Sequence, residues 1–208
     1  MRPDGGPGGA GRGPAISGRA GRLPATPRQY LDAGLDLLAE HGPAGTTITA
    51  LCRRLGTTSG SFYHHFSGWD CYRERLVQHW ERRHLDHQRA VTGTPGGPPQ
   101  AGLARYRAAV LALPHSVDAA VRVWAVARPE VAAAAQRVDS GWFHALHGLL
   151  LDVCADAATA RRLATLGHAL VVGCQLVHGR RTGEVVGDML ADFETMVGQA
   201  APHRATPP

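Results

Sequence analysis

The chain has 208 residues, of which 44% are hydrophobic and 19% charged, and its formal net charge is +5. This length is sufficient for one or two compact domains with a buried core. Because the sequence has neither an uninterrupted apolar run of about 20 residues nor an apolar signal core near its start, it favours a cytoplasmic protein and argues against a membrane span.

Residues 1–24 are rich in glycine, proline and arginine and poor in large apolar side chains, so we expect a disordered arm. Its arginines outnumber its one aspartate, Asp4, and could reach into a DNA minor groove. A solvated tail and a translation start further along the chain are open alternatives. Residues 201–208 are expected to form a second disordered tail.

The first predicted helix begins at Pro27, since proline suits the first helical turn. Thr26 and Gln29 form the T-x-x-Q pattern of a capping box. Leucines at helical spacing give this helix an apolar face, and the pair His41-Gly42 ends it.

Two short helices follow, separated by a tight turn. Thr47 can cap the first, whose apolar residues recur at helical spacing. Gly56 ends it, because glycine adopts the left-handed conformation of a helix end without steric cost. Thr58 can cap the second, at about residues 59–66. This is the layout of a helix-turn-helix, which lays its second helix in a DNA major groove.

The second of these helices has side chains suited to reading DNA. Gly60 and Ser61 are small, so base edges could approach the backbone closely, and two phenylalanines four residues apart anchor the helix to the core. Tyr63 and His64 lie off the anchoring face and can reach phosphates and bases. From the residues alone, an αα-hairpin with solvated Tyr63 and His64 remains an open alternative.

Residues 28–76 resemble the N-terminal domain of the TetR (tetracycline-repressor) family of bacterial transcription factors. The strings YLDAGLDLLAEHG, PAGTTITALCRRLG and TTSGSFYHHF carry the resemblance. It implies a homodimeric regulator, most often a repressor, that binds a pseudo-palindromic operator in double-stranded DNA and responds to a small-molecule effector. Two recognition helices would enter successive major grooves about 34–36 Å apart.

Residues of the caps, the recognition helix and the position just after it are expected to contact DNA. They are Thr47, Thr58, Ser59, Gly60, Ser61, Tyr63, His64 and Trp69. Trp69 departs from the pattern of the family, which usually has a lysine at this position. An indole N–H can donate to a phosphate, but it carries no charge.

The remainder of the chain predicts an all-α bundle, with about nine helices in the whole protein. A charged helix is expected at residues 69–91, with Leu76, Trp80 and Leu85 on its buried edge. A loop rich in glycine and proline is expected at residues 92–102. Five further helices are expected near residues 103–113, 117–127, 129–154, 158–178 and 184–199.

Histidines on the charged helix raise the question of a metal. His84 and His87 share a face at a spacing of three residues, which could serve a metal ion. No carboxylate or cysteine completes an obvious set of ligands, so we expect solvated histidines and no metal site. No cofactor is indicated either.

The resemblance also implies a cavity for a small effector within the helical body. The candidate lining residues combine large apolar rings with a few polar groups, and they are Trp124, Trp142, Phe143, His144, His147 and Cys174. As a group they suit an apolar ligand with one or two polar anchors. Each one taken singly also fits an ordinary core or surface position.

The last two predicted helices resemble the dimerisation element of the family. Their apolar stripes are Leu163, Leu166, Leu170 and Val177 on one helix and Val186, Met189, Phe193 and Met196 on the next, with Gly167 and Gly173 allowing close approach. Closure of the monomer core by these stripes is the alternative. The expected domains are a helix-turn-helix domain at 25–72 and an effector-binding and dimerisation domain at 73–200.

The sequence thus predicts a transcriptional regulator and not an enzyme. An enzyme on a helical bundle is one alternative, but the chain has no nucleophile-elbow context, no Glu-x-x-His pair and no glycine-rich phosphate loop. A ligand-binding or partner-binding dimer whose head has lost its affinity for DNA is the other, because of Trp69.

Overall fold

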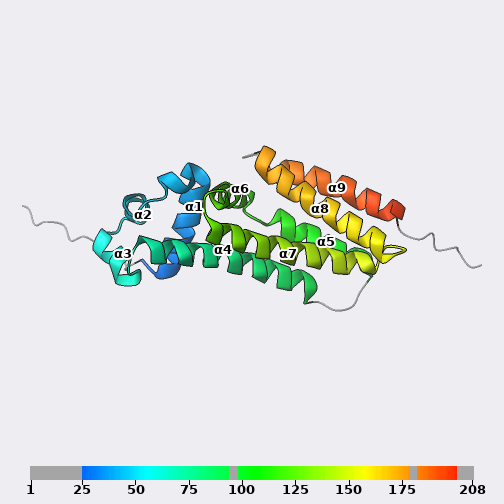
Figure 1. Ribbon diagram of the computed structural model, residues 1–208, viewed down its shortest axis with the longest axis horizontal. Coiled ribbons are helices and arrows are strands. Elements are labelled where there is room, and N and C mark those ends of the chain that lie inside the picture. The colour runs from blue at the N-terminus through cyan, green and yellow to red at the C-terminus, as the bar shows by residue number, and fades with distance from the viewer. Residues whose placement is uncertain (1–24, 94–97, 179–181, 201–208) are drawn as a thin grey trace, which may run out of the picture.

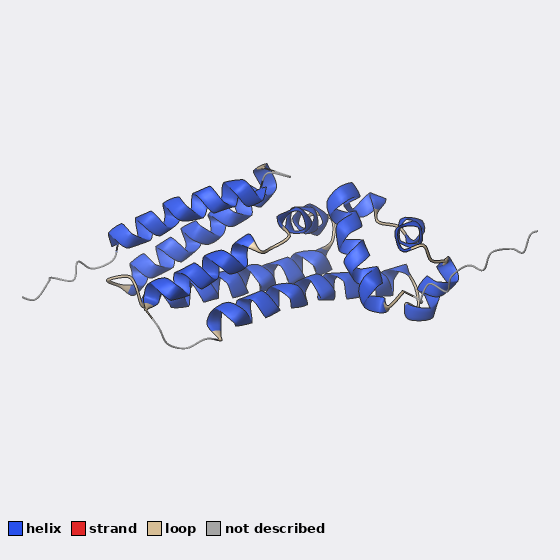
Figure 2. Cartoon of the chain, turned by 180° about the vertical axis from the view of Figure 1, so that it is seen from behind, coloured by secondary structure: helices blue, strands red, loops and turns tan. Residues whose placement is uncertain are grey.

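The computed structural model describes residues 25–93, 98–178 and 182–200, and within these ranges every regular element is a helix (Figures 1 and 2). The helices of these ranges are α1 Pro27–Gly45, α2 Ile48–Leu55, α3 Ser59–His65, α4 Trp69–Thr92, α5 Pro99–Leu111, α6 His115–Ala125, α7 Pro129–Leu151, α8 Ala157–Val177 and α9 Thr182–Ala200. The predicted all-α class is confirmed. The predicted arm at 1–24 and tail at 201–208 lie outside the described residues.

The first three helices form a head at one end of an elongated molecule (Figure 1). The capping box that opens α1 is confirmed, since Gln29 N–H donates to Thr26 Oγ1 at 3.3 Å and Thr26 N–H donates to Gln29 Oε1 at 2.8 Å. At Gly42, where the sequence predicts the end of this helix, the helix bends but does not end. Gly42 has a φ of 68°, and one more turn follows through Gly45.

The long helix α4 connects the head to the body. It begins next to α3, packs against α1 and continues alongside α7 (Figure 1). Leu76 and Trp80 are buried as predicted, but Leu85 is 36% exposed and its assignment to the buried edge is wrong. Leu85 follows Trp80 by about 1.4 turns, which rotates it away from the face that Trp80 buries.

The predicted loop at residues 92–102 is too long. Helix α5 begins at Pro99 and not near Leu103, with proline in its first turn. A proline is accommodated there because the first N–H groups of a helix have no partner within the helix. The other predicted helix boundaries lie within a few residues of the observed ones.

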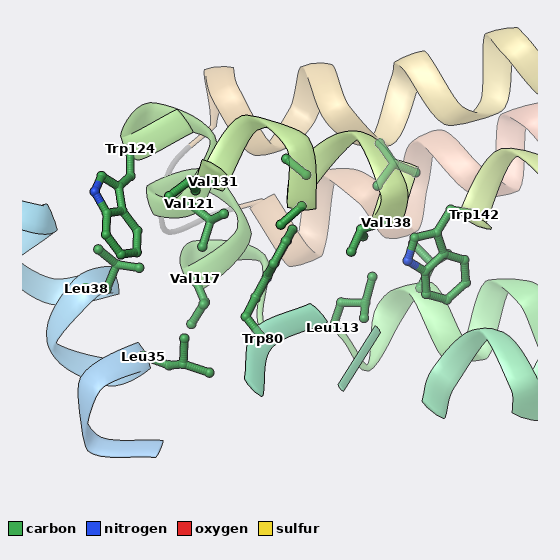
Figure 3. Close-up of a cluster of buried hydrophobic side chains, with 14 of the residues drawn as sticks. Leu35, Leu38, Trp80, Leu113, Val117, Val121, Trp124, Val131, Val138 and Trp142 are labelled. Carbon is green, nitrogen blue, oxygen red and sulfur yellow. The ribbon is translucent and has the colours of Figure 1, made fainter. Parts of the chain in front are cut away.

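Helix α6 lies between the head and the rest of the body. Leu35 and Leu38 of α1 face Val117 and Trp124 of α6 in one continuous apolar core (Figure 3). The same core continues to Trp142 on α7 (Figure 3). A displacement of α6 would therefore directly move the side chains that pack against α1 in the head.

A buried polar network holds α4 to α6 and corrects one prediction. His84 is 3% exposed and not solvated. Its Nδ1 accepts a hydrogen bond from Trp142 Nε1–H at 3.0 Å, so its Nε2 carries the proton donated to Asp118 Oδ1 at 2.9 Å. Trp80 Nε1–H donates to the same oxygen at 2.8 Å, and Gln175 Nε2–H donates to Asp118 Oδ2 at 3.1 Å.

The network extends to the half-buried edge of the body. Arg122 donates to Gln175 Oε1 at 2.9 Å and holds Asp139 with two hydrogen bonds of 2.7 and 2.9 Å. His168 Nε2 lies 3.5 Å from the same Asp139 carboxylate. Four helices are joined in this way, because the participating side chains come from α4, α6, α7 and α8.

Acid should destabilise the protein through this region. Burial lowers the pKa of both His115 and His168. Below the ordinary histidine pKa of about 6.5, the unfolded chain binds protons that the folded chain does not, so stability falls as the pH drops. We expect the urea midpoint to be lower at pH 5.5 than at pH 7.5. His115→Gln should reduce the dependence of the urea midpoint on pH. His144→Gln, at an exposed position of α7, should leave that dependence unchanged. A urea midpoint that rises on acidification would contradict the role of the buried histidines.

The apolar stripes of α8 and α9 divide between core and surface. Val186 and Phe193 are buried, and a Cβ on Gly167 would lie 2.8 Å from the Phe193 ring, so these residues close the monomer. Leu166, Val177 and Met196 are exposed. In the described part of the chain, no helix combines the length and apolar character that a membrane span requires.

Candidate nucleic-acid interface

The turn between α2 and α3 is built from the threonines and the glycine that the sequence singles out. Thr47 Oγ1 accepts from Ala50 N–H at 3.2 Å at the start of α2. Gly56, with a φ of 64°, ends α2 in the left-handed region. Thr58 Oγ1 accepts from Ser61 N–H at 3.3 Å at the start of α3. Each threonine hydroxyl proton remains available to a phosphate, because the caps use only the oxygen as acceptor.

Helix α3 is short, and aromatic packing holds it in place. Phe62 and Phe66 are fully buried. The Phe62 ring centroid lies 5.8 Å from that of Tyr30 on α1, 5.1 Å from that of Phe66 and 5.3 Å from that of Tyr72 on α4. These edge and tilted contacts fix both the position and the rotation of the helix.

Hydrogen bonds behind the aromatic cluster fix α1 relative to α4 and the turn. Tyr30 Oη–H donates to Thr57 Oγ1 at 2.8 Å, and Tyr72 Oη–H donates to the Tyr30 carbonyl at 2.9 Å. Burial raises the pKa of Tyr72, so its phenol stays a donor. A Cβ on Gly34 would lie 1.9 Å from Tyr72 Oη, and α1 can approach α4 this closely only because Gly34 has no side chain.

The opposite face of α3 is open to solvent. Ser59, Gly60 and His64 are exposed, Tyr63 is 56% exposed, and Ser61 is half-buried. The one side-chain atom within 4 Å of a Cβ added to Gly60 is Thr58 Oγ1, at 3.7 Å, so a base edge could approach the backbone there. The face therefore presents hydroxyl, imidazole and bare backbone groups together, which are groups that can contact phosphates and base edges.

Trp69 stands partly in the core and partly at the surface. Its ring stacks on Tyr72 with centroids 5.1 Å apart and an interplanar angle of 22°. The side chain is half-buried, at the first residue of α4. Its predicted contact with a DNA phosphate stays a prediction, since the residue also serves to pack α4 against the head.

Two features of the head were not foreseen from the sequence. His65 Nε2–H donates to the Ala25 carbonyl at 2.8 Å, which ties the start of the described chain to α3. Arg54 pairs with Glu40 of α1, and both Arg54 and its neighbour Arg53 are exposed. Neither pair follows a fixed spacing along the chain, so the periodicity of the sequence does not predict these contacts.

The six predicted effector residues do not share one cavity. Trp124 lines two openings where the head meets the body, and Trp142 lines a cavity of 20 Å³ inside the bundle. Phe143 stacks on His147 with centroids 5.7 Å apart, and the exposed His144 bonds to the Ser140 carbonyl of its own helix. Cys174 is buried, and burial raises the pKa of its thiol. Among the described residues, no group of three or more histidine, cysteine, aspartate or glutamate side chains could hold a metal ion.

Comparisons with known proteins match both the head and the whole fold. Residues 31–69 match the family model described as bacterial regulatory proteins, tetR family. A transcriptional regulator from Rhodococcus sp. Rha1 superposes with a TM-score of 0.69 at 23% identity, over 88% of this chain and all of the other. No curated protein matches the sequence.

Two further solved structures share the fold. A transcriptional regulator from Saccharomonospora viridis, in complex with choline, has a TM-score of 0.67 at 20% identity, over 81% of this chain and 95% of that one. E. coli NemR in its reduced form has a TM-score of 0.66 at 15% identity, over 86% and 99%. The head therefore matches the tetR family model over residues 31–69, and the nine helices of the described ranges share the fold of these solved transcriptional regulators.

Proposed function

We propose that the protein is a homodimeric repressor that leaves a pseudo-palindromic operator when a small molecule binds. The observation that supports DNA binding is the exposed face of α3. Ser59, Gly60, Tyr63 and His64 are exposed on this helix, and the buried Phe62 fixes it from behind. Residues 25–72 act as the DNA-binding domain and residues 73–200 as the body, in the cytoplasm.

Dimerisation is proposed through α8 and α9. These helices lie side by side on one flank of the molecule (Figure 1). Leu166, Leu176, Val177 and Met196 are between 44% and 74% exposed. Apolar side chains grouped on one surface are typical of protein–protein interfaces. A molar mass of a single chain at micromolar concentration would exclude the dimer.

Release by an effector is supported by likeness and by packing. The Saccharomonospora viridis regulator with this fold is in complex with choline. In this chain α6 packs on both α1 and α7, so a ligand that shifts α6 would change the position of the head. Release requires only that the ligand bind more tightly to the arrangement whose head spacing does not fit the two grooves.

The direct test of DNA binding concerns the open face of α3. We expect Tyr63→Ala and His64→Ala each to weaken operator binding by about tenfold, the loss typical of one or two contacts worth about 1.4 kcal/mol. Helix content and oligomeric state should not change, because both side chains are exposed. The assay is a shift titration against a short operator from the upstream DNA of the gene, repeated at several salt concentrations.

His144→Ala is the matched control, since His144 is an exposed histidine on α7, far along the chain from the head. It should bind the operator as the unmodified protein does. If Tyr63→Ala and His64→Ala also bind normally, α3 is not the reading helix. If all proteins bind weakly and without sequence preference, the head does not read this DNA.

A further inference from the structure

A cavity of 320 Å³ lies where the head meets the body, and we call it the junction cavity. Its walls come from the C-terminal turn of α1, the first turns of α4 and the connection between α6 and α7. The residues that matter for its chemistry are Leu38, Trp69, Arg73, Leu76, Trp124 and Arg128. Its volume falls at the lower end of the range for small-ligand sites, roughly 300–1,000 Å³.

The charge of the junction cavity is one-sided. Arg73 and Arg128 are the charged residues among its described lining, which includes no aspartate or glutamate. A second opening of 480 Å³, the α4–α7 cleft, shares Arg73 and Trp124 with it but has four carboxylates, among them Glu74 and Glu130. The two openings therefore favour ligands of opposite charge.

Both arginines keep hydrogen-bonding capacity for a ligand. Arg73 pairs with Asp70 through one terminal nitrogen, and its Nε–H is buried without a hydrogen-bond partner in the described part of the chain. Arg128 approaches Glu130 no closer than 3.8 Å, beyond hydrogen-bond distance. A guanidinium that is not already held by two hydrogen bonds can bind a carboxylate through its fork of donors.

Trp124 supplies a flat apolar wall and one further donor. The side chain is 9% exposed, and its ring reaches over Leu38 of α1 (Figure 3). None of the hydrogen bonds found among the described residues uses its indole N–H. By contrast, the indoles of Trp80 and Trp142 are both hydrogen-bonded inside the network. The buried side-chain atoms of the described ranges that lack a partner do not include Trp124 Nε1, so this indole N–H is accessible from outside and can donate to a ligand oxygen.

We propose that the junction cavity binds a small organic anion with an apolar, ring-sized body. Arg128 and Arg73 hold the anionic group, Trp124 donates to it, and Trp69, Leu38 and Leu76 enclose the apolar part. This proposal rests on the proposed function in taking that anion as the effector. A bound ligand would contact α1, the first residue of α4 and the α6–α7 connection at once, and so set the position of the head relative to the body.

The test uses three probes with the same ring system and different charge. They are 1-naphthylacetate, 1-naphthylmethylamine and 1-naphthalenemethanol, titrated by calorimetry into the full-length protein without DNA. We expect saturable binding of the carboxylate at one site per chain, with the alcohol and the amine at least about tenfold weaker. Equal binding of the amine or the alcohol, or no binding of the carboxylate at millimolar concentration, overturns the proposal.

Matched variants locate the site. Arg128→Gln should weaken the carboxylate by about tenfold, and Trp124→Phe, which keeps a ring but loses the donor, by several-fold. Arg137→Gln is the control, because Arg137 lines only the α4–α7 cleft and pairs there with Glu81. If Arg128→Gln binds the carboxylate as tightly as the unmodified protein does, or if Arg137→Gln loses binding equally, the carboxylate does not bind in the junction cavity.

A second arm separates this proposal from the function on which it rests. Operator binding is measured with and without saturating 1-naphthylacetate. Operator binding that the anion weakens supports both proposals. If the anion binds in the calorimeter but the protein does not bind the operator, the proposed function is wrong and the site is retained. If the protein binds the operator but not the anion, the proposed function is retained and the site is wrong. If the protein binds both the anion and the operator, and the anion does not change operator binding, the anion is not the effector.

Discussion

Asp118→Ala is expected to lower the free energy of unfolding by about 3–5 kcal/mol, because it removes the charged acceptor shared by several buried donors, each of which costs about 1–3 kcal/mol when left unsatisfied. The carboxylate is 1% exposed and accepts from three side chains, those of Trp80, His84 and Gln175. Alanine would leave the Trp80 and His84 donors buried without an acceptor, and would leave Gln175 Nε2 with His115 Nδ1 at 3.2 Å as its remaining partner. Burial by itself would raise the pKa of Asp118, but hydrogen bonds from His84 and Trp80 outweigh it and the pKa is lowered, so the group is charged at neutral pH.

Two further variants separate the network from the loss of a carboxylate in general. Asp118→Asn keeps the shape and one acceptor oxygen, and should cost about 1–3 kcal/mol. Asp86→Ala removes an exposed carboxylate of α4 that pairs with Arg89, and should change stability by less than about 0.5 kcal/mol. Urea unfolding at pH 7.5 measures all three. A loss at Asp118→Ala no greater than at Asp86→Ala would show that the network adds nothing to stability.

Phe62→Ala should abolish operator binding at concentrations where the unmodified protein is saturated. The side chain is fully buried between α1, α3 and α4, and deleting such a ring typically costs about 3–5 kcal/mol. Because α3 has seven residues and one other buried aromatic in Phe66 at its end, the helix should lose its fixed position before the body unfolds.

Phe62→Leu and Phe143→Ala are the accompanying variants. Leucine keeps most of the apolar volume and should retain part of the operator affinity. Phe143 is a half-buried phenylalanine on α7, stacked on His147, and its loss should leave DNA binding intact. Operator binding by Phe62→Ala with normal affinity would mean that the aromatic cluster does not position the recognition helix.

The head could be predicted closely from the sequence because its signals are local. Thr26, Thr47 and Thr58 act within three residues of themselves, and Gly56 acts on its own backbone. The anchoring phenylalanines are four residues apart, a spacing that places them on one side of a helix. Periodicity and capping rules read such features directly.

The interior of the body could not be predicted in the same way. His84 and Asp118 are 34 residues apart, and His84 and Trp142 are 58 apart, so no spacing rule pairs them. From the sequence, a histidine on a charged helix is therefore expected at the surface, whereas His84 is buried. The junction cavity could not be predicted for the same reason, because Leu38, Trp69 and Arg128 meet only when α1, α4 and the α6–α7 connection pack together.

The bond from His65 to the Ala25 carbonyl has a practical consequence for any experiment that attaches something to the protein. It fixes the start of the described chain next to the recognition helix, whereas α9 ends at the opposite end of the long axis (Figure 1). A tag or dye joined close before residue 25 would lie beside α3, the helix that we propose binds DNA. Surface immobilisation or labelling for binding measurements should therefore use the end of α9, which leaves the face of α3 unobstructed.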